Sequence, residues 1–184
     1  MQNINEACES VLVSEQELSE ICDRLAAQIT KNYVNSGRDL VFVTVLKGSM
    51  MFAADLLRRI PLPVALEFMK VSSYGAQTES SGAIAVHLDL KREISGADVI
   101  VIEDIVDSGR TLQKLSALLE TRGANSVKCC TLLDKPERRV VQFEADYVGK
   151  CIPDVFVVGY GLDYDEKFRN LPYVGVLKPS VYEK

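Results

Sequence analysis

Along the chain, short apolar runs of strand length alternate with segments in which apolar residues recur at helical spacing. The runs at 40–46, 99–102 and 127–133 are almost uninterrupted, which is typical of strands buried on both faces in parallel sheets covered by helices. The segments at 50–60 and 112–119, which follow the first two runs, are predicted to be helices. This pattern predicts an α/β fold with a mostly parallel sheet.

The segment before the first run predicts an amphipathic helix. Ser14 and Glu17 form a capping-box pattern at its start, apolar residues then recur at every third or fourth position, and Ser36-Gly37 ends it. Shorter or half-exposed strands are expected at 11–13, 64–71, 84–90, 147–148, 155–158 and 174–177. No repeat, linker or low-complexity stretch divides the chain, so one domain is expected.

The stretch from Val99 to Thr111, VIVIEDIVDSGRT, combines these elements with reactive side chains. Glu103 and Asp104 are predicted to fall where the buried strand emerges, which is the edge at which open α/β sheets bind ligands. The turn from Asp107 to Thr111 then offers backbone N–H groups and two hydroxyls at a helix N-terminus, a site for an anion. From this turn, Asp107 is placed to accept a proton from a ligand above the strand ends.

The three carboxylates of this stretch lie within five positions and repel one another unless something positive occupies the site. A hydrated Mg²⁺ bound through one or two carboxylates plus substrate oxygens fits, and so do vicinal ribose hydroxyls that donate hydrogen bonds. A Glu-Asp pair after a strand is ordinary by itself, but the whole pattern is specific. It predicts a site for a phosphorylated, hydroxyl-rich, metal-bound sugar.

Two other segments are candidates for the same edge of the sheet. Lys47-Gly48-Ser49 follows the strand at 40–46 and would present a cation and an open backbone to a phosphate, although these three residues alone fit an exposed lysine and a turn glycine better. The polar loop at 72–82 is long for a compact domain, as lids often are, with Gly75 and Gly82 as hinges. A hairpin connection without a role fits this loop almost as well.

Composition and charge narrow the class of protein. The net charge of −5 and the pI near 5.0 argue against a general nucleic-acid binder. The five cysteines form no CxxC pair, and one histidine is too few for most Cys/His zinc sites. Buried, reduced thiols are expected instead, with Cys129 and Cys130 on opposite faces of a strand, which indicates a reducing compartment. No targeting or membrane-spanning pattern is found, so the cytoplasm is the expected location.

Val99 to Thr111 also resembles the phosphoribosyl-pyrophosphate-binding motif of the type I phosphoribosyltransferases. Four further blocks, in family order, are similar to the hypoxanthine-guanine phosphoribosyltransferases, and the resemblance covers roughly residues 10 to 178, closest to the short bacterial members. These blocks are Leu46-Lys47-Gly48-Ser49, Ser72-Ser73-Tyr74-Gly75, Leu132-Leu133-Asp134-Lys135-Pro136 and the segment from Pro153 to Tyr164.

The resemblance implies the type I phosphoribosyltransferase fold in a single domain over 1–184. This fold has a central, mostly parallel twisted sheet flanked by helices, a small hood from the N-terminal lead-in and 155–184, and a flexible lid loop at 72–83. It also implies Mg²⁺-dependent transfer of 5-phosphoribose from phosphoribosyl pyrophosphate (PRPP) to N9 of hypoxanthine or guanine, giving IMP or GMP and pyrophosphate in purine salvage. A homodimer or homotetramer without nucleic-acid or membrane partners is implied as well.

The resemblance further assigns roles to single residues. Glu103 and Asp104 would hold the ribose hydroxyls, directly or through metal, and Asp107 would accept a proton near the purine imidazole ring. The 5′-phosphate would be bound by Ser108, Gly109, Thr111 and the backbone of Arg110. Pyrophosphate would be bound by Lys47, Gly48 and Arg169, with a cis peptide between Leu46 and Lys47, and the purine would be surrounded by Lys135, Phe156, Val157 and Asp163. Metal would be held by Glu103, Asp104 and Asp163, and the lid would contain Ser73 and Tyr74. Arg138 and Arg139 receive no role.

Two alternatives remain beside this enzyme. A regulatory phosphoribosyltransferase-like protein that binds RNA or DNA would keep the fold, but the acidic charge and the complete catalytic set argue against it. An enzyme for xanthine or a pyrimidine is the other. Lys135 can only donate hydrogen bonds, so it suits a 6-oxo group and rejects the amino group of adenine. Lys135 and Phe156 also disfavour a pyrimidine, but the sequence does not rank hypoxanthine, guanine and xanthine.

Overall fold

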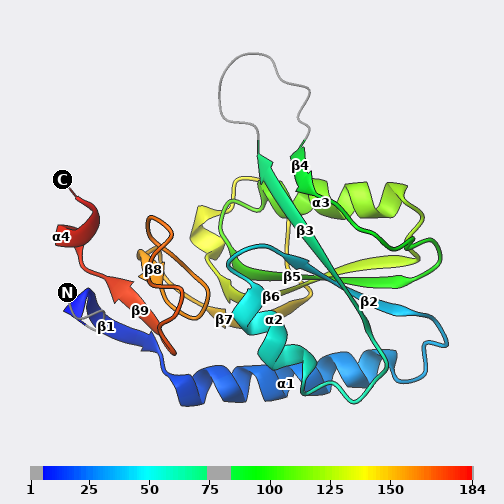
Figure 1. Cartoon of the computed structure of the whole chain (residues 1–184), viewed down its shortest axis with the longest axis horizontal. Helices are drawn as coiled ribbons and strands as arrows, with labels where there is room; N and C mark the ends of the chain where they lie inside the picture. Colours follow the sequence, from blue (N-terminus) through cyan, green and yellow to red (C-terminus); the bar gives the residue numbers. More distant parts are fainter. Residues whose placement is uncertain (1–5, 74–83, 184) are drawn as a thin grey trace.

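The computed structural model describes residues 6–73 and 84–183, and the larger of the two sheets in this part has six strands in the order β4-β3-β2-β5-β6-β7 (Figure 1). Neighbouring strands from β3 to β7 are parallel, and β4 pairs antiparallel with β3 at one edge. The predicted mostly parallel sheet is therefore confirmed. Its strands are β2 (Leu40–Val45), β3 (Ala65–Ser73), β4 (Ile84–Leu88), β5 (Asp98–Val106), β6 (Ser126–Asp134) and β7 (Tyr147–Cys151).

Helices cover both faces of this sheet, as the uninterrupted apolar runs predict (Figure 1). The helices α1 (Glu15–Tyr33) and α2 (Met50–Leu57) pack on one face, in a core that includes Phe42 and Ile100. The helix α3 (Arg110–Thr121) packs on the other face, in a core with Val43 and Val101. Because successive side chains of a strand point to opposite faces, β2 and β5 contribute to both cores.

The helix boundaries follow local signals. At the start of α1, the Ser14 hydroxyl accepts a hydrogen bond from the backbone N–H of Glu17 at 3.2 Å, as the capping pattern predicts. The helix α2 ends at Leu57, so the predicted end at Ile60 was wrong. Beyond Leu57 the backbone N–H groups bond three residues back, a tighter turn, and Pro61 disfavours helical backbone at Ile60.

The strand β5 is longer than predicted. Its pairing with β2 stops at Ile102, but its pairing with β6 continues to Val106 opposite Asp134. Glu103 and Asp104 therefore lie within the strand, but the first, fully buried part of β5 ends at Ile102, so they fall where the buried strand emerges, as predicted. The apolar run marks only the part of β5 that has a neighbour on both sides.

A second, three-stranded antiparallel sheet is built from the two ends of the chain, the segments that the resemblance assigns to a hood. Its order is β1-β9-β8, with β1 (Cys8–Val13), β8 (Val157–Val158) and β9 (Val174–Leu177), and the short helix α4 (Pro179–Tyr182) follows β9. The described part of the chain begins just before β1 and ends just after α4, beside this sheet (Figure 1). The strand predicted at 155–158 is shorter because the N–H of Val155 bonds to the Pro153 carbonyl in a turn at 2.9 Å.

All five cysteines are free, and Cys129 and Cys130 belong to the cores on opposite faces of the sheet, as predicted. Cys22 is also buried, but Cys8 is half-buried and Cys151 is exposed. The expectation of five buried thiols was therefore wrong for Cys151, because this residue ends β7, the edge strand of the large sheet. In the part of the chain that the structure describes, no helix has the length and apolar character needed to cross a membrane.

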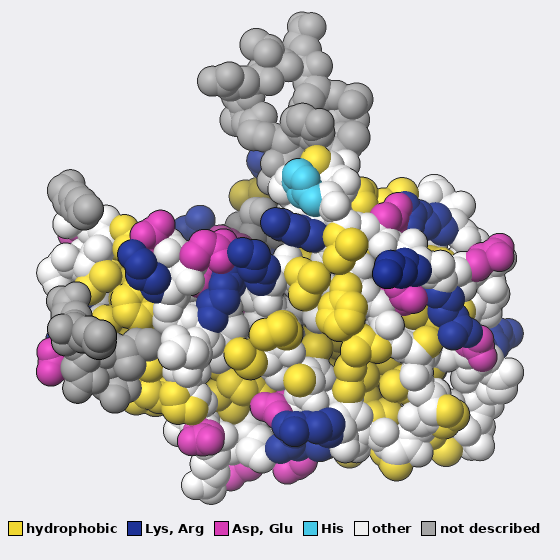
Figure 2. Space-filling view, in the orientation of Figure 1, with side chains coloured by type: hydrophobic (Ala, Val, Ile, Leu, Met, Phe, Trp, Pro, Cys, Tyr) yellow, Lys and Arg dark blue, Asp and Glu magenta, His cyan; other side chains and the backbone are white. Residues whose placement is uncertain are grey.

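The surface combines charged and apolar regions. Figure 2 shows hydrophobic side chains gathered over the middle of one face, where β3 and α2 lie in Figure 1. The exposed large apolar side chains of these two elements include Met50, Leu66 and Phe68. The single histidine, His87, lies on β4, and its Nε2 lies 2.8 Å from the Ser72 hydroxyl.

Candidate active site

A cleft of about 430 Å³ lies at the carboxyl ends of β2 and β5. Ten of the residues predicted for the site line this cleft together: Lys47, Gly48, Glu103, Asp104, Asp107, Ser108, Gly109, Thr111, Asp163 and Arg169. Arg110, Lys135, Phe156 and Val157 do not line it. Ser73 is the last residue of β3, whereas Tyr74, Gly75 and Gly82 of the predicted lid lie outside the described residues.

Two carboxylates of β5, Glu103 and Asp104, lie in this cleft with few hydrogen-bond partners. The Oε2 atom of Glu103 is buried and has no hydrogen-bond partner among the described residues, while Asp104 Oδ1 accepts one from the N–H of Ile105 at 2.7 Å. Burial, and then the charge of Asp104, raise the pKa of Glu103 well above its usual range. Burial also raises the pKa of Asp104 to about 6. A ligand that brings positive charge or hydrogen-bond donors would stabilise both carboxylates in their ionised form.

The Glu103→Gln variant is expected to be more stable than the natural protein at neutral pH, by about 1 kcal/mol or more. A carboxylate whose pKa is raised on folding contributes stability below its unfolded pKa and loses that contribution as pH rises towards the folded pKa. The melting temperature of the ligand-free variant should therefore exceed that of the natural protein by about 2–4 °C or more at pH 8, and by less at pH 5. Thermal unfolding of Glu103→Gln and of Glu120→Gln, a control at an exposed position, measures these differences in melting temperature. A difference for Glu103→Gln that does not increase with pH would contradict the prediction.

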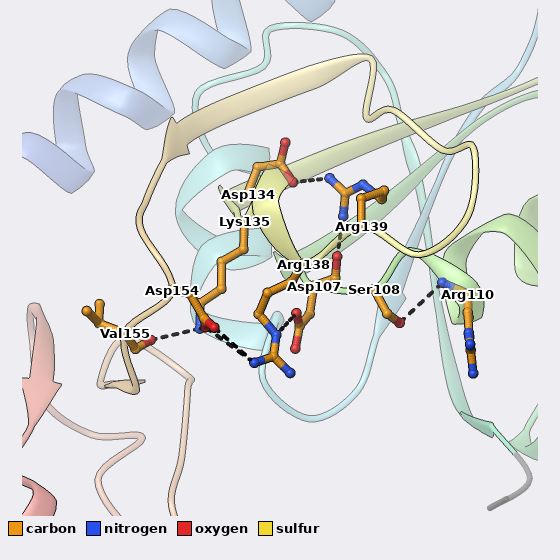
Figure 3. A network of polar contacts seen from close by, with 9 residues as sticks. All are labelled: Asp107, Ser108, Arg110, Asp134, Lys135, Arg138, Arg139, Asp154 and Val155. Atoms are coloured by element: carbon orange, nitrogen blue, oxygen red, sulfur yellow. Dashed lines mark hydrogen bonds and ion pairs between the residues drawn. The ribbon is translucent and has the colours of Figure 1, made fainter.

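The turn between β5 and α3 has the geometry of an anion site. Gly109 caps α3 with a φ of +78°, in the left-handed region that favours glycine. A Cβ atom there would also lie 2.9 Å from Cδ of Arg139, so the turn has no room for a side chain. The N–H groups at the start of α3 point out of this turn, and a helix N-terminus attracts negative charge. The Arg110 side chain is exposed and leads away from Asp107 (Figure 3).

On the opposite wall of the cleft, the segment after β2 approaches β5 and the C-terminal segment closely. The Leu46–Lys47 peptide bond is cis, as the resemblance implies. A Cβ atom at Gly48 would lie 1.5 Å from Asp104 Oδ2, and one at Gly161 would lie 1.9 Å from the Gly48 carbonyl oxygen. Gly48 is thus required by packing against the Asp104 carboxylate, a reason that the sequence alone did not supply.

Two cations of the cleft are held by carboxylates of the C-terminal segment. The Lys47 ammonium bonds to Glu166 at 2.8 Å, and Arg169 bonds to Asp163 at 2.8 Å and to Glu166 at 3.4 Å. The Arg169 Nε atom is buried without a hydrogen-bond partner among the described residues. Glu166 is not among the residues predicted from the sequence, where its only signal is a carboxylate three residues before a predicted cation. An anion that enters the cleft would compete with Glu166 and Asp163 for these cations.

The residues predicted to bind the purine lie beside this cleft rather than in it. The buried Lys135 ammonium donates to the Val155 carbonyl at 2.7 Å and to Asp154 at 3.3 Å. The Phe156 ring is 40% exposed and stacks on Tyr182 with centroids 5.0 Å apart, and Val157 is buried in β8. The backbone N–H of Lys135 bonds to the carbonyl of Val106, next to Asp107, at 2.9 Å, so the two groups of residues adjoin.

The fold is an α/β fold in which a mostly parallel sheet lies between helices. Its cleft carries paired carboxylates, two cations and a helix N-terminus, which is the arrangement expected of a site for a phosphorylated ligand. The family model of the phosphoribosyl transferase domain matches residues 11–165. The chain therefore belongs to the phosphoribosyltransferase family and, within it, to the hypoxanthine-guanine phosphoribosyltransferases.

The relatives support this placement in both sequence and structure. The hypoxanthine-guanine phosphoribosyltransferase of Staphylococcus aureus is 52% identical over 172 residues, which cover 94% of this chain and 95% of the relative. That of Staphylococcus epidermidis is 51% identical over 175 residues, covering 95% and 97%. A crystal structure of a hypoxanthine phosphoribosyltransferase from Staphylococcus aureus superposes with a TM-score of 0.93, at 49% identity and with complete coverage of both chains.

A more distant structure shows the same architecture. A mutant hypoxanthine phosphoribosyltransferase from Trypanosoma cruzi, in a ternary substrates complex, is 43% identical and has a TM-score of 0.92, with 96% of this chain and 99% of that one covered. The predicted family, fold class and enzyme class are therefore confirmed.

Proposed function

We propose that this enzyme transfers 5-phosphoribose from PRPP to N9 of hypoxanthine or guanine, with Mg²⁺, giving IMP or GMP and pyrophosphate in purine salvage. The observation that carries the proposal is the composition of the cleft. It combines two carboxylates short of partners, Glu103 and Asp104, with the N-terminal turn of α3 and with the cations Lys47 and Arg169. A sugar with hydroxyls, a 5′-phosphate and a pyrophosphate needs each of these groups.

In this proposal the donor substrate binds across the cleft. Glu103 and Asp104 accept hydrogen bonds from the ribose hydroxyls, and the backbone of the turn from Ser108 to Thr111 binds the 5′-phosphate. Lys47 and Arg169 bind pyrophosphate, exchanging Glu166 and Asp163 for the phosphate oxygens. The unpartnered Nε of Arg169 supports this role, because a buried donor without an acceptor is costly until an anion supplies one.

The residues of the cleft fit a magnesium ion that is completed by substrate. Among the described residues, no group of three or more side chains forms a ready metal cluster. Glu103, with its orphaned buried oxygen, and Asp104 would supply carboxylate ligands, and Asp163 would do so once released from Arg169. Mg²⁺ commonly binds through one or two carboxylates plus substrate oxygens. When bound, it would neutralise the charge that develops on the leaving pyrophosphate.

The base would bind between Asp107 and the β8 side of the site. Asp107 accepts the proton that leaves the purine imidazole ring as the new bond forms. Lys135 donates to the 6-oxo group, and its ammonium is already held near that position by Asp154 and Val155. Phe156, now stacked on Tyr182, would stack on the purine ring instead, and the Val157 backbone would contact its other edge.

The assembly and location of the protein belong to the same proposal. We infer a homodimer or homotetramer in the cytoplasm, without nucleic-acid or membrane partners. The apolar side chains exposed on α2 and β3, among them Met50, Leu66 and Phe68, offer a face that association would bury. Sedimentation at several protein concentrations would show whether the protein is an oligomer; a monomer throughout would contradict this part.

A spectrophotometric assay of hypoxanthine, guanine, xanthine and adenine with PRPP and Mg²⁺ tests the proposal. Hypoxanthine and guanine are expected to be converted and adenine is not, because Lys135 cannot accept a hydrogen bond from the 6-amino group. Turnover of adenine at a comparable rate would contradict the role of Lys135. The absence of any nucleotide product from the 6-oxopurines would contradict the function itself.

A further inference from the structure

The carboxylate of Asp107 is held by an arginine from the loop after β6. Arg138 Nε donates a hydrogen bond to Asp107 Oδ1, and Arg138 Nη1 lies 3.2 and 3.4 Å from the two carboxylate oxygens of Asp154 (Figure 3). One guanidinium therefore spans two carboxylates that are 47 positions apart in the chain, one in the turn before α3 and one before β8. The resemblance assigns no role to Arg138.

Asp154, the second carboxylate of this bridge, also binds Lys135, the lysine proposed to contact the purine 6-oxo group. Asp154 Oδ1 accepts from Lys135 Nζ at 3.3 Å, so a continuous chain of charges runs from Asp107 through Arg138 and Asp154 to Lys135. The short 3₁₀ helix Pro136–Arg138 connects the two cations covalently, and the backbone N–H of Arg138 bonds to the Lys135 carbonyl at 3.1 Å. The neighbouring Arg139 donates to the Asp107 carbonyl and to Asp134, which fixes the backbone beneath.

The bridge is built for orientation more than for stability. The side chains of Arg138, Asp107 and Asp154 are 49%, 46% and 45% exposed, and ion pairs this accessible contribute about 0–1 kcal/mol to folding. The hydrogen bond from Arg138 goes to one oxygen of Asp107, Oδ1. The contact thus restricts the rotation of the carboxylate of Asp107, which lines the cleft.

We propose that Arg138 is a positioning residue for the transfer reaction, which holds the Asp107 carboxylate with Oδ2 towards the purine and couples that orientation to Asp154 and Lys135. This inference rests on the proposed function. When Asp107 takes up the purine proton its charge is neutralised, and Asp154 then keeps the guanidinium paired and in place. The second anchor explains why an arginine, with donors on several nitrogens in a fixed plane, stands at this position.

Steady-state kinetics of Arg138→Ala and Arg138→Lys test the proposal. We expect kcat of the alanine variant to fall about 10-fold, since a small misplacement of a reacting group can cost up to ~10²-fold, with the KM for PRPP nearly unchanged. The lysine variant should recover only part of the loss, because one ammonium does not span both carboxylates. Melting temperatures should be unchanged. Arg122→Ala, which breaks an ion pair of similar exposure with Asp89 at the far end of α3, should leave kcat unchanged.

A double-mutant cycle distinguishes action through Asp107 from a general effect. In an Asp107→Asn background, Arg138→Ala should lower kcat by less than about 2-fold, because the group that it positions is already lost. Unchanged kcat in Arg138→Ala, or the full loss persisting in the Asp107→Asn background, would overturn the inference. Failure of the proposed function is recognised separately, since the natural enzyme would then form no nucleotide from 6-oxopurines and PRPP.

Discussion

Replacing Asp107 by Asn is expected to lower turnover of hypoxanthine by about 10²–10⁴-fold, the usual effect of losing an acid–base group. Asn has nearly the same shape as Asp and can still accept the hydrogen bond from Arg138, but it cannot take up a proton at neutral pH. Asp107 is half-exposed in the turn that leads into α3, so the substitution should leave the fold intact.

The measurement is kcat with saturating PRPP and Mg²⁺, together with the KM for each substrate. Because Asp107 is proposed to act on the base in the transition state, kcat should fall far more than the KM for PRPP rises. Asp39→Asn is a suitable control. Asp39 is exposed and pairs with Arg92, and it precedes the amino end of β2, whereas the cleft lies at the carboxyl end of this strand. Turnover of Asp107→Asn within a few-fold of the natural enzyme would remove Asp107 from its proposed role.

The sheet could be predicted from sequence because its central strands leave few alternatives. Every residue of β2 is buried, and the first five residues of β5 are buried as well. A run of this kind is stable only between two covered faces, which requires helices on both sides and hence parallel strands. The ends of strands are less determined. Glu103 and Asp104 remain in β5 only because β6 continues beside them, and no local pattern reveals the length of a neighbouring strand.

Ten residues that line the cleft could also be predicted from sequence, but their partners could not. Lys47 meets Glu166 across 119 positions, and Arg138 meets Asp107 across 31. The chain has 26 acidic residues, and sequence spacing does not select one of them as the partner of a given cation. Motifs identify side chains that follow strand ends, whereas ion pairs across the cleft depend on how the C-terminal segment packs against the sheet.

The burial of the acid pair is a second property that only the structure supplies. A Glu-Asp pair suggests exposed charges, yet Oε2 of Glu103 is buried and Gly48 packs against the Asp104 carboxylate. The ligand-free site therefore carries an electrostatic cost that a bound cation and substrate would relieve. The raised pKa values of both carboxylates follow from this arrangement and lead to a prediction about metal.

Excess EDTA is expected to abolish turnover, and Mg²⁺ added beyond the chelator should restore it. Glu103 and Asp104 without a cation disfavour the charged donor substrate, and the cations of the cleft, Lys47 and Arg169, are already paired with carboxylates. EDTA should not change the melting temperature of the substrate-free enzyme, because the described residues form no cluster that binds metal without substrate oxygens. EDTA presaturated with Mg²⁺ is the matched control. Activity that survives in excess chelator would contradict the metal assignment.

The same carboxylates would make the proposed requirement for magnesium dependent on pH. Carboxylate ligands bind metal when they are deprotonated, and burial raises the pKa of Asp104 to about 6. Protons therefore compete with Mg²⁺ as pH falls through about 6. Burial and the charge of Asp104 also raise the pKa of Glu103 well above its usual range, which adds to this competition. The Mg²⁺ concentration for half-maximal rate should rise between pH 8 and pH 5.5. Titrating Mg²⁺ at fixed PRPP across this range measures the effect, and a constant half-saturation would show that neither carboxylate loses a proton when metal binds.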